Sequence, residues 1–318
     1  MDRITGLLLG TAVGDSLGLP REGLSPRRAR RLYPGPLRQR LGLLSDDTEH
    51  ACMTAQALLA EPNDPRRFGR VLARKLRWWL AALPPAIGFG TLRALAFRRA
   101  VWSAGNGAVM RAPVIGAVLD DVDRIEPFVA ASTAITHRDP RALAGALAIA
   151  IAAHHAARDR ADAVLDAIRA RVVDRELLAA LDRVEAMLDR PSIELAHELG
   201  LSRGITGYVH HTVPMCLHAW LRAPHEFARP VAEIIELGGD SDTTGAIVGA
   251  LAGASAGEGA IPREWLAIRD APRSLAWIRK LARSTAPIRI AWPLIPLRNL
   301  AFAAIVIAVG LRRLLPPY

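Results

Sequence analysis

The sequence predicts an all-α fold, and three observations support that prediction. Apolar residues recur at helical spacing in segments of roughly ten to twenty residues, which short loops separate. No run of alternating apolar and polar residues, no βαβ rhythm and no repeat of constant period is evident in the sequence. With 318 residues, of which 51% are hydrophobic, the chain is long enough to bury a large core. We therefore expect a compact domain of about a dozen helices.

Helical periodicity and turn residues divide the chain into helices and loops in a definite order. The expected helices cover residues 3–19, 46–59, 66–82, 140–154, two amphipathic helices within 158–200, 213–221, 226–237 and 245–257. A polar notch at residues 14–18 is expected to interrupt the first helix. The expected loops cover residues 23–44, 84–91 and 201–212. Trp78 and Trp79 are interpreted as anchors in the core or in an interface.

Charge and cysteine content narrow the function classes. The chain has 41 Lys and Arg against 31 Asp and Glu, a net charge of +10. Because the arginines are scattered without interleaved aromatic residues, we do not expect nucleic-acid binding, and the basic surface favours an anionic, nucleotide-like ligand. Cys52 and Cys216 lie in apolar helical patterns, which predicts a reducing, cytoplasmic location without disulfides. The N-terminal apolar run lacks a basic flank, which favours a core helix over a signal peptide.

The helix expected at residues 245–257 has a glycine at every fourth position. It follows Gly238-Gly239-Asp240-Ser241-Asp242-Thr243-Thr244, a glycine turn with two carboxylates and three hydroxyls. Each glycine inside a helix costs roughly 1 kcal/mol relative to alanine. We therefore expect that the backbone of another helix approaches closely, offsets this cost and holds the helix start deep in the domain.

A second cluster of acids and hydroxyls, Ser45-Asp46-Asp47-Thr48-Glu49, also lies at a helix start. Residues 41–65 and 230–262 contain no Lys or Arg. Four carboxylates brought together would repel by roughly 4 kcal/mol per close pair, so a distant arginine or a metal would have to neutralise them. Oxygen ligands without Cys or His suit Mg²⁺, Mn²⁺ or Ca²⁺ and not zinc. In the alternative interpretation Ser45 is a helix N-cap and the acids only complement helix dipoles.

Three further segments carry candidate ligand residues. Gly88 and Gly90 lie in a loop that could present backbone N–H groups to phosphate oxygens or form a plain turn. Asn106 stands between two glycines, where it could cap a helix or contact a ligand. His137 lies at a helix boundary, where capping is the commoner role. The adjacent histidines at 210–211 would point apart on a helix, so we do not expect a zinc site.

The C-terminal segment needs a separate interpretation. Residues 300–311 are apolar throughout and Arg312-Arg313 follows them. Twelve residues are too few to span a bilayer, and extension toward the N-terminus adds two prolines and two polar residues. We expect a domain over residues 1–285 and an apolar tail over residues 286–318, packed on the domain or on a partner chain. A membrane-surface or tail anchor is the alternative, and the oligomeric state stays open.

Taken together, the motifs resemble those of the ADP-ribosylglycohydrolase family, over about residues 3–260. The resemblance rests on five motifs in order: Gly14-Asp15 with Glu22, Ser45-Asp46-Asp47-Thr48, Ser103-Ala104-Gly105-Asn106-Gly107-Ala108-Val109-Met110-Arg111, Thr136-His137, and Gly238-Gly239-Asp240-Ser241-Asp242-Thr243. It implies an all-α fold with two Mg²⁺ ions, or Mn²⁺ in their place, in a central cleft.

The resemblance also implies roles for particular residues. The residues on metal-ligand positions are Ser45, Asp46, Asp47, Asp240, Asp242 and Thr243. The residues with an implied catalytic role are Glu22, Asp46 and Asp47. The residues implied to bind ADP-ribose are Gly88 and Gly90 at the pyrophosphate, and Ser103, Asn106 and His137 in the pocket. Some members carry an aromatic residue at the position of Ala104, so a stacking contact is missing there, and Tyr208 could supply it instead.

The function implied is that of a Mg²⁺-dependent hydrolase that cleaves the glycosidic bond between ADP-ribose and an acceptor and releases ADP-ribose. The acceptor would be a protein side chain or a small molecule, and the sequence does not reveal which. A catalytically silent ADP-ribose binder or structural relative is the main alternative. A metal-dependent phosphohydrolase that cuts the pyrophosphate is a third possibility.

Overall fold

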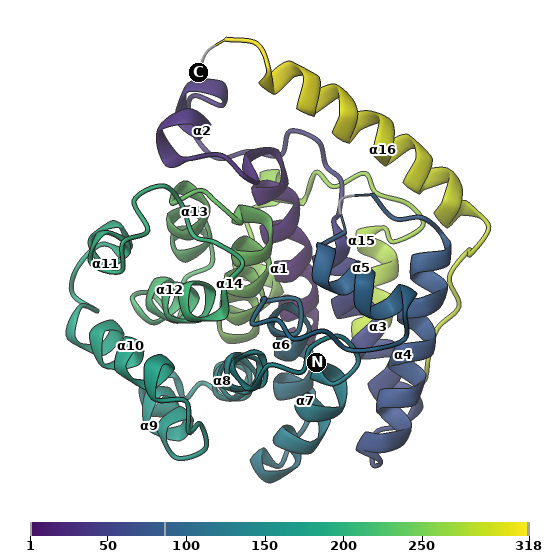
Figure 1. Ribbon diagram of the computed structural model, residues 1–318, viewed down its shortest axis with the longest axis horizontal. Helices are drawn as coiled ribbons and strands as arrows, with labels where there is room; N and C mark the ends of the chain where they lie inside the picture. The colour runs from purple at the N-terminus through teal and green to yellow at the C-terminus, as the bar shows by residue number, and fades with distance from the viewer. Residues whose placement is uncertain (1, 86, 317–318) are drawn as a thin grey trace.

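The computed structural model describes residues 2–85 and 87–316, and within them it confirms the all-α prediction, with helices and no β-strand (Figure 1). The helices in chain order are α1 (Asp2–Gly18), α2 (Pro26–Leu32), α3 (Asp46–Ala60), α4 (Pro65–Ala81), α5 (Phe89–Ala96), α6 (Ala112–Val118), α7 (Ile125–Thr133), α8 (Pro140–Ala156), α9 (Val164–Arg169), α10 (Arg175–Ala186), α11 (Ser192–Glu198), α12 (Val209–Leu221), α13 (Ala228–Glu236), α14 (Ser241–Ala256), α15 (Leu275–Ala282) and α16 (Leu294–Arg313).

The centre of the molecule is the pair α1 and α14, which lie side by side in Figure 1. The two backbones approach so closely that a Cβ atom added to Gly10 would lie 2.0 Å from the carbonyl oxygen of Gly249. The contact is reciprocal, because a Cβ atom on Gly249 would lie 2.2 Å from the carbonyl oxygen of Gly10. The close approach predicted for the glycine helix is therefore confirmed, and its partner is α1. Helices α3, α8, α12, α13 and α15 pack around this pair.

Several boundaries differ from the predictions. The predicted interruption of the first helix at residues 14–18 is wrong, since α1 runs unbroken to Gly18. The segment 23–44 is not loop throughout, because Ser25 caps the short helix α2 through the backbone N–H of Arg28. Residues 158–200 form three helices, α9 to α11, and not two. The short helices α2, α9 and α11 have seven, six and seven residues, which leaves little periodicity to detect.

The C-terminal apolar segment is longer than expected. Helix α16 has 20 residues and includes Pro296, Arg298 and Asn299, so the expectation that these residues end the apolar segment is wrong. Pro296 is tolerated because it lies in the first turn, where backbone N–H groups have no intrahelical partner. By length and mean hydropathy of 2.1 the helix could cross a bilayer, and 17% of its apolar window is buried against the domain.

Candidate active site

The N-terminus of α3 is fixed by a buried carboxylate on α1. Asp15 accepts hydrogen bonds from the backbone N–H of Ser45 at 2.9 Å and of Thr48 at 3.3 Å. The hydroxyl of Ser45 accepts from the N–H of Asp47 at 3.2 Å, which is N-cap geometry. The capping role of Ser45 is thus present, and the same oxygen lies within 3.1 Å of the Asp47 carboxylate. Glu49 turns away from this cluster toward Trp79 and Arg273.

The N-terminus of α14 is fixed by the glycine turn before it. Gly238 and Gly239 have φ angles of +68° and +80°, which favour glycine over residues with a side chain. A Cβ atom on Gly239 would lie 2.0 Å from the carbonyl oxygen of Ile205, so the turn is also too crowded for one. Bridges to Leu24 and Ile205 hold the turn between two loops. This turn sets the direction in which Asp240 and the first turn of α14 enter the cleft.

The two acidic helix N-termini meet. The hydroxyl of Thr243 on α14 donates a hydrogen bond of 3.2 Å to the carboxylate of Asp47 on α3. Asp242 is buried beside them and accepts from the N–H of Thr243. The structure therefore brings together two segments that lie almost two hundred residues apart in the sequence.

A cavity of about 260 Å³ opens at this junction. The predicted site residues that line it are Glu22, Asp46, Gly88, Gly90, Ser103, Asn106, His137, Asp240, Asp242 and Thr243. The other lining residues are Thr91, Gly105, Gly107, Met110 and Gly207. Ser45 and Asp47 lie behind this lining and reach it through Thr243. Tyr208 is not in the lining, because its ring packs against His210, His211 and the Arg141 guanidinium.

Asn106 links the wall of the cavity to α14. Its side-chain amide donates to Asp240 at 2.6 Å and to the hydroxyl of Thr212 at 3.0 Å. Its backbone N–H donates to the carbonyl of Gly207 at 2.8 Å. A Cβ atom on neighbouring Gly107 would lie 3.2 Å from the His137 ring, so the glycines leave room for that imidazole. The side chain of Asn106 does not cap the helical turn that follows it, and contact with a ligand stays a prediction that its place in the cavity lining permits.

His137 lines the cavity, and the fully buried Arg111 lies behind it. Burial and the nearby Arg111 lower the pKa of His137 to about 4, so its imidazole is neutral at physiological pH. The Arg111 guanidinium is fully buried, bonded to Ser132 and Thr136, and its Nη1 atom has no partner. Burial lowers the pKa of Arg111 to about 10, and Asp46 partly opposes that shift. The acidic segments contain no Lys or Arg of their own, so a sequence-distant arginine or a metal was expected near them. Arg111 is that arginine, and it interacts with Asp46.

One arginine does not neutralise the cluster. Desolvation by the surrounding protein, and then repulsion from neighbouring carboxylates, raises the pKa of Asp46, Asp47 and Asp242 well above the ordinary range. Burial raises the pKa of Asp15 to about 7. Glu22 also has a raised pKa, because of burial and repulsion from Asp240, and Arg313 partly opposes the increase.

The chemistry of these donors fits a hard divalent cation. The Oδ1 atom of Asp47 is buried and has no hydrogen-bond partner, which is costly for a carboxylate unless a cation binds it. In the described ranges, no three His, Cys, Asp or Glu side chains are close enough to form a metal site by themselves. The hydroxyls of Ser45 and Thr243 would therefore have to act as additional metal ligands. The carboxylates, which repel one another in the absence of a cation, would also have to move closer together.

Two important residues were missed in reading the sequence. Asp15 was noted only as part of a motif, although it organises the α3 N-terminus, and Arg111 was not assigned a role. The glycines of α1 were also overlooked, although Gly6, Gly10, Gly14 and Gly18 repeat every fourth residue as those of α14 do. That shared period was a usable signal for the pairing of the two helices.

The fold and the cavity define a class: all-α domains in which two acidic helix N-termini share one cleft. Comparison with protein-family models identifies the family, because residues 1–293 match the model of ADP-ribosylglycohydrolase. The chain belongs to this family, which confirms the resemblance seen in the motifs.

Individual relatives agree with this assignment. A protein of Archaeoglobus fulgidus described as uncharacterized is 32% identical, over 83% of this chain and 90% of its own. The ADP-ribosyl-[dinitrogen reductase] glycohydrolase of Rhodospirillum rubrum is 28% identical, over 85% and 90%. Bovine ADP-ribosylhydrolase ARH3 is 26% identical, over 83% and 88%. A solved structure of an ADP-ribosylglycohydrolase-related protein complex superposes with a TM-score of 0.65 at 28% identity, over 88% of this chain and 95% of the other.

Proposed function

We propose that the protein is a Mg²⁺-dependent hydrolase that cleaves the bond between ADP-ribose and an acceptor, which is a protein side chain or a small molecule. Family membership and the names of the R. rubrum and bovine relatives support hydrolysis of an ADP-ribosyl group. The observation that carries the proposal is the Thr243–Asp47 hydrogen bond, because it unites both acidic helix entrances at one cavity.

Two divalent ions, Mg²⁺ or Mn²⁺, would be held by oxygen atoms of both helix entrances. The proposed ligands are Ser45, Asp46, Asp47, Asp240, Asp242 and Thr243. When bound, such ions supply Lewis acidity toward the vicinal hydroxyls of the distal ribose and positive charge near its anomeric carbon. The unpartnered Asp47 oxygen and the raised pKa values of Asp46 and Asp242 support this assignment, since a cation would relieve both costs.

The rest of the cavity suits the remainder of ADP-ribose. Gly88 is the N-cap of α5 and Gly90 lies in its first turn, so backbone N–H groups are available for the pyrophosphate. Neutral His137 and the hydroxyl of Ser103 line the wall and can donate or accept hydrogen bonds without adding charge.

Glu22 is the proposed general acid and base. Burial and repulsion from Asp240 raise its pKa, which favours the protonated form that a general acid needs when the acceptor leaves. The resulting carboxylate would then take a proton from the attacking water. Asp46 and Asp240 lie at the same cavity, where negative charge stabilises the oxocarbenium-like transition state of glycoside cleavage.

The test is release of free ADP-ribose from ADP-ribosylated arginine and serine substrates, with Mg²⁺ and with EDTA. Release that requires Mg²⁺ would support the proposal. Binding of ADP-ribose without release from any substrate would instead identify a silent binder. AMP among the products would identify cleavage of the pyrophosphate.

A further inference from the structure

Positive charge is concentrated in two segments of the chain, residues 65–119 and residues 271–318. The first contains ten Lys and Arg and the second contains eight, and neither contains Asp or Glu. The rest of the chain has 23 Lys and Arg against 31 Asp and Glu. The net positive charge of the protein therefore comes entirely from these two segments.

The two segments meet in space. The Asn299 side chain on α16 donates to the carbonyl of Ala82 after α4 at 2.8 Å. The Trp78 and Trp292 rings lie edge to face with centroids 6.1 Å apart, and their side chains are 61% and 38% exposed.

Figure 1 places α4, α5, α15 and α16 on one side of the molecule. Arg111 is buried at the candidate active site, and Arg273 and Arg298 are buried in ion pairs with Glu49 and Asp270. The exposed positive charge on this side is therefore concentrated on α4, at Arg66, Arg67, Arg70, Arg74 and Arg77.

Helix α16 presents an apolar stripe on this side. The stripe consists of Leu297, Leu300, Ile307 and Leu311. The intervals between them are three, seven and four residues, so they lie on one face of the helix. All four are 60–71% exposed, and the opposite face buries Ile295, Asn299 and Phe302. The family match ends at residue 293, so this helix lies outside it. We name these four residues the outer stripe.

The helix is tied down at both ends. Near its N-terminus Arg298 forms a buried ion pair with Asp270, and near its C-terminus Arg313 donates to the carbonyls of Pro20 and Glu22 at 2.9 Å. These contacts hold α16 along the surface, as Figure 1 shows. The high exposure of the outer stripe means that it faces away from the domain. In this arrangement the helix lies across the molecule and is positioned to rest in the plane of a membrane surface rather than to span it.

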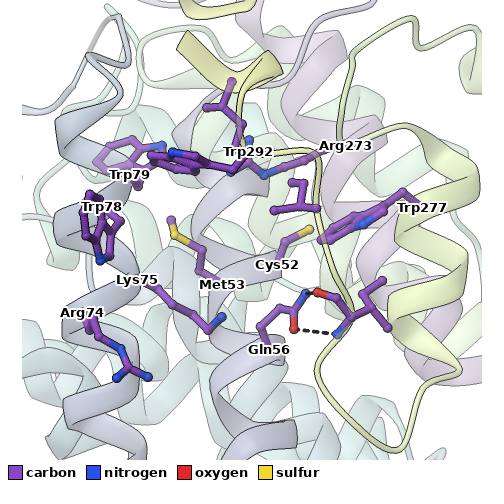
Figure 2. A pocket seen from close by; sticks show the side chains of 13 residues that line it. Cys52, Met53, Gln56, Arg74, Lys75, Trp78, Trp79, Arg273, Trp277 and Trp292 are labelled. Carbon is purple, nitrogen blue, oxygen red and sulfur yellow. Dashed lines mark hydrogen bonds between the residues drawn. The ribbon is translucent and has the colours of Figure 1, made fainter.

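A cavity of about 500 Å³ lies at the N-terminal end of the outer stripe. Figure 2 shows its lining: Trp78, Trp79, Trp277 and Trp292 form walls, Cys52 and Met53 lie between them, and Arg74 and Lys75 stand at one edge. Indole rings favour the boundary between lipid headgroups and acyl chains, and basic side chains beside them favour phosphate.

We propose that the outer stripe, with Trp78 and Trp292 at its end, docks the protein on an anionic phospholipid surface. The apolar side chains would enter the headgroup boundary while the basic residues of α4 approach the lipid phosphates. A second copy of the chain fits less well, because two such faces would bring two acid-free, positively charged segments together.

The experiment is co-sedimentation of the full chain with vesicles of phosphatidylcholine, alone or mixed with phosphatidylserine. We expect partitioning onto the mixed vesicles that weakens with salt, and little onto phosphatidylcholine alone. Leu300→Asp combined with Ile307→Asp should reduce partitioning at least tenfold. Arg74→Gln should reduce it about fivefold. The control is Val173→Asp, which charges a 90% exposed apolar residue in the acid-rich part of the chain and should change nothing.

Three results would overturn the proposal: no binding of the wild-type chain to the mixed vesicles, equal binding to both vesicle types, or unchanged binding of the double variant. Light scattering after size-exclusion chromatography tests the remaining alternative, which is self-association through the outer stripe. A wild-type dimer that the double variant converts to a monomer, without vesicle binding by either, would assign the outer stripe to self-association. Circular dichroism of each variant checks that the exposed substitutions leave the fold intact.

Discussion

Thr243 donates a 3.2 Å hydrogen bond to Asp47 although 196 positions separate the two residues. Each lies in the first turn of a helix that is anchored independently, α3 by Asp15 and α14 by the glycine turn. Because both anchors belong to the buried core around α1, the two helix N-termini are held together before any ligand arrives. An enzyme that needs fixed oxygen ligands benefits from this arrangement.

The first prediction concerns Asp47→Asn. The substitution removes one of several mutually repelling buried carboxylates, so we expect the metal-free protein to gain about 1 kcal/mol of stability. It also removes a proposed metal ligand, so the increase in Tm that Mg²⁺ gives the wild-type protein should disappear. Thermal unfolding with Mg²⁺ and with EDTA measures both effects. Exposed Asp162→Asn is the control. Retention of the full Mg²⁺ effect in Asp47→Asn would argue against the ligand role.

The second prediction concerns pH. Burial raises the pKa of Asp15 to about 7, and the pKa values of Asp46 and Asp242 are raised as well. The folded, metal-free protein thus binds more protons than the unfolded chain, so its free energy of unfolding should fall as the pH rises through about 7. His137, with its pKa lowered to about 4, has the opposite effect, but only below its ordinary pKa of 6.5.

Denaturant titrations in EDTA from pH 6.5 upward isolate the carboxylate effect. The free energy of unfolding should decrease with pH in EDTA and depend on pH much less in saturating Mg²⁺, because bound cations favour the ionised acids. A free energy of unfolding that increases with pH in EDTA would contradict this prediction. It would show that other groups of the protein already stabilise the ionised forms of the buried acids.

The third prediction concerns Glu22→Gln. Loss of a general acid and base should lower turnover by roughly 10²- to 10⁴-fold, while ADP-ribose affinity changes little, since the amide keeps the shape of the side chain. Initial rates and calorimetric titration with ADP-ribose give the two quantities. Exposed Glu264→Gln serves as the control. Near-normal turnover in Glu22→Gln would remove Glu22 from the mechanism.

The fourth prediction concerns Arg313, which we regard as a positioning residue for Glu22. It holds the carbonyls of Pro20 and Glu22, and its charge opposes the increase in the Glu22 pKa. Arg313→Gln should lower kcat about tenfold through misplacement of the turn. It should leave KM nearly unchanged and move the alkaline limb of the pH–rate profile to higher pH, because Glu22 would then stay protonated to higher pH. The neighbouring Arg312→Gln, which loses a contact with Pro316 only, should do neither. Equal effects of the two substitutions would contradict this role.

The fifth prediction concerns the crossing of α1 and α14. Gly10→Ala places a methyl group against the carbonyl oxygen of Gly249, so we expect a loss of about 3 kcal/mol or more in the free energy of unfolding. Gly310→Ala, in the exposed part of α16 with open space around it, should instead gain about 0.5–1 kcal/mol. Urea titration compares them. Similar stabilities for the two variants would mean that the helices can separate at low cost.

The sequence predicted the features that depend on local pattern. The glycine period of α14 predicted close packing, and the acids at two helix starts predicted a shared site, because both signals lie within a few residues. Geometry that depends on tertiary contacts was not predictable in this way. Asp15 looked like an interruption of α1, yet its helix continues because the buried carboxylate is satisfied by Ser45 and Thr48 from α3.

Long-range partners explain the other differences. Tyr208 was a candidate for stacking on the ligand, but its ring packs against the adjacent His210 and His211 and against the Arg141 guanidinium. Of these three residues only Arg141, 67 positions earlier, is distant in the sequence. The length of α16 was underestimated because two prolines and two polar residues, Arg298 and Asn299, argued against a longer apolar helix. The buried partner of Arg298, Asp270, lies 28 residues earlier and could be identified only in the folded chain.

The most direct test of the shared site is a crystal structure of the protein grown with Mn²⁺ and soaked with ADP-ribose, with anomalous scattering used to locate the ions. We predict two Mn²⁺ peaks between the N-termini of α3 and α14, each bound by oxygen atoms from both helices, with the distal ribose beside them. Peaks bound by only one of the two helices, or no peak in the cavity lined by Asp46 and Asp240, would contradict the proposed dinuclear centre.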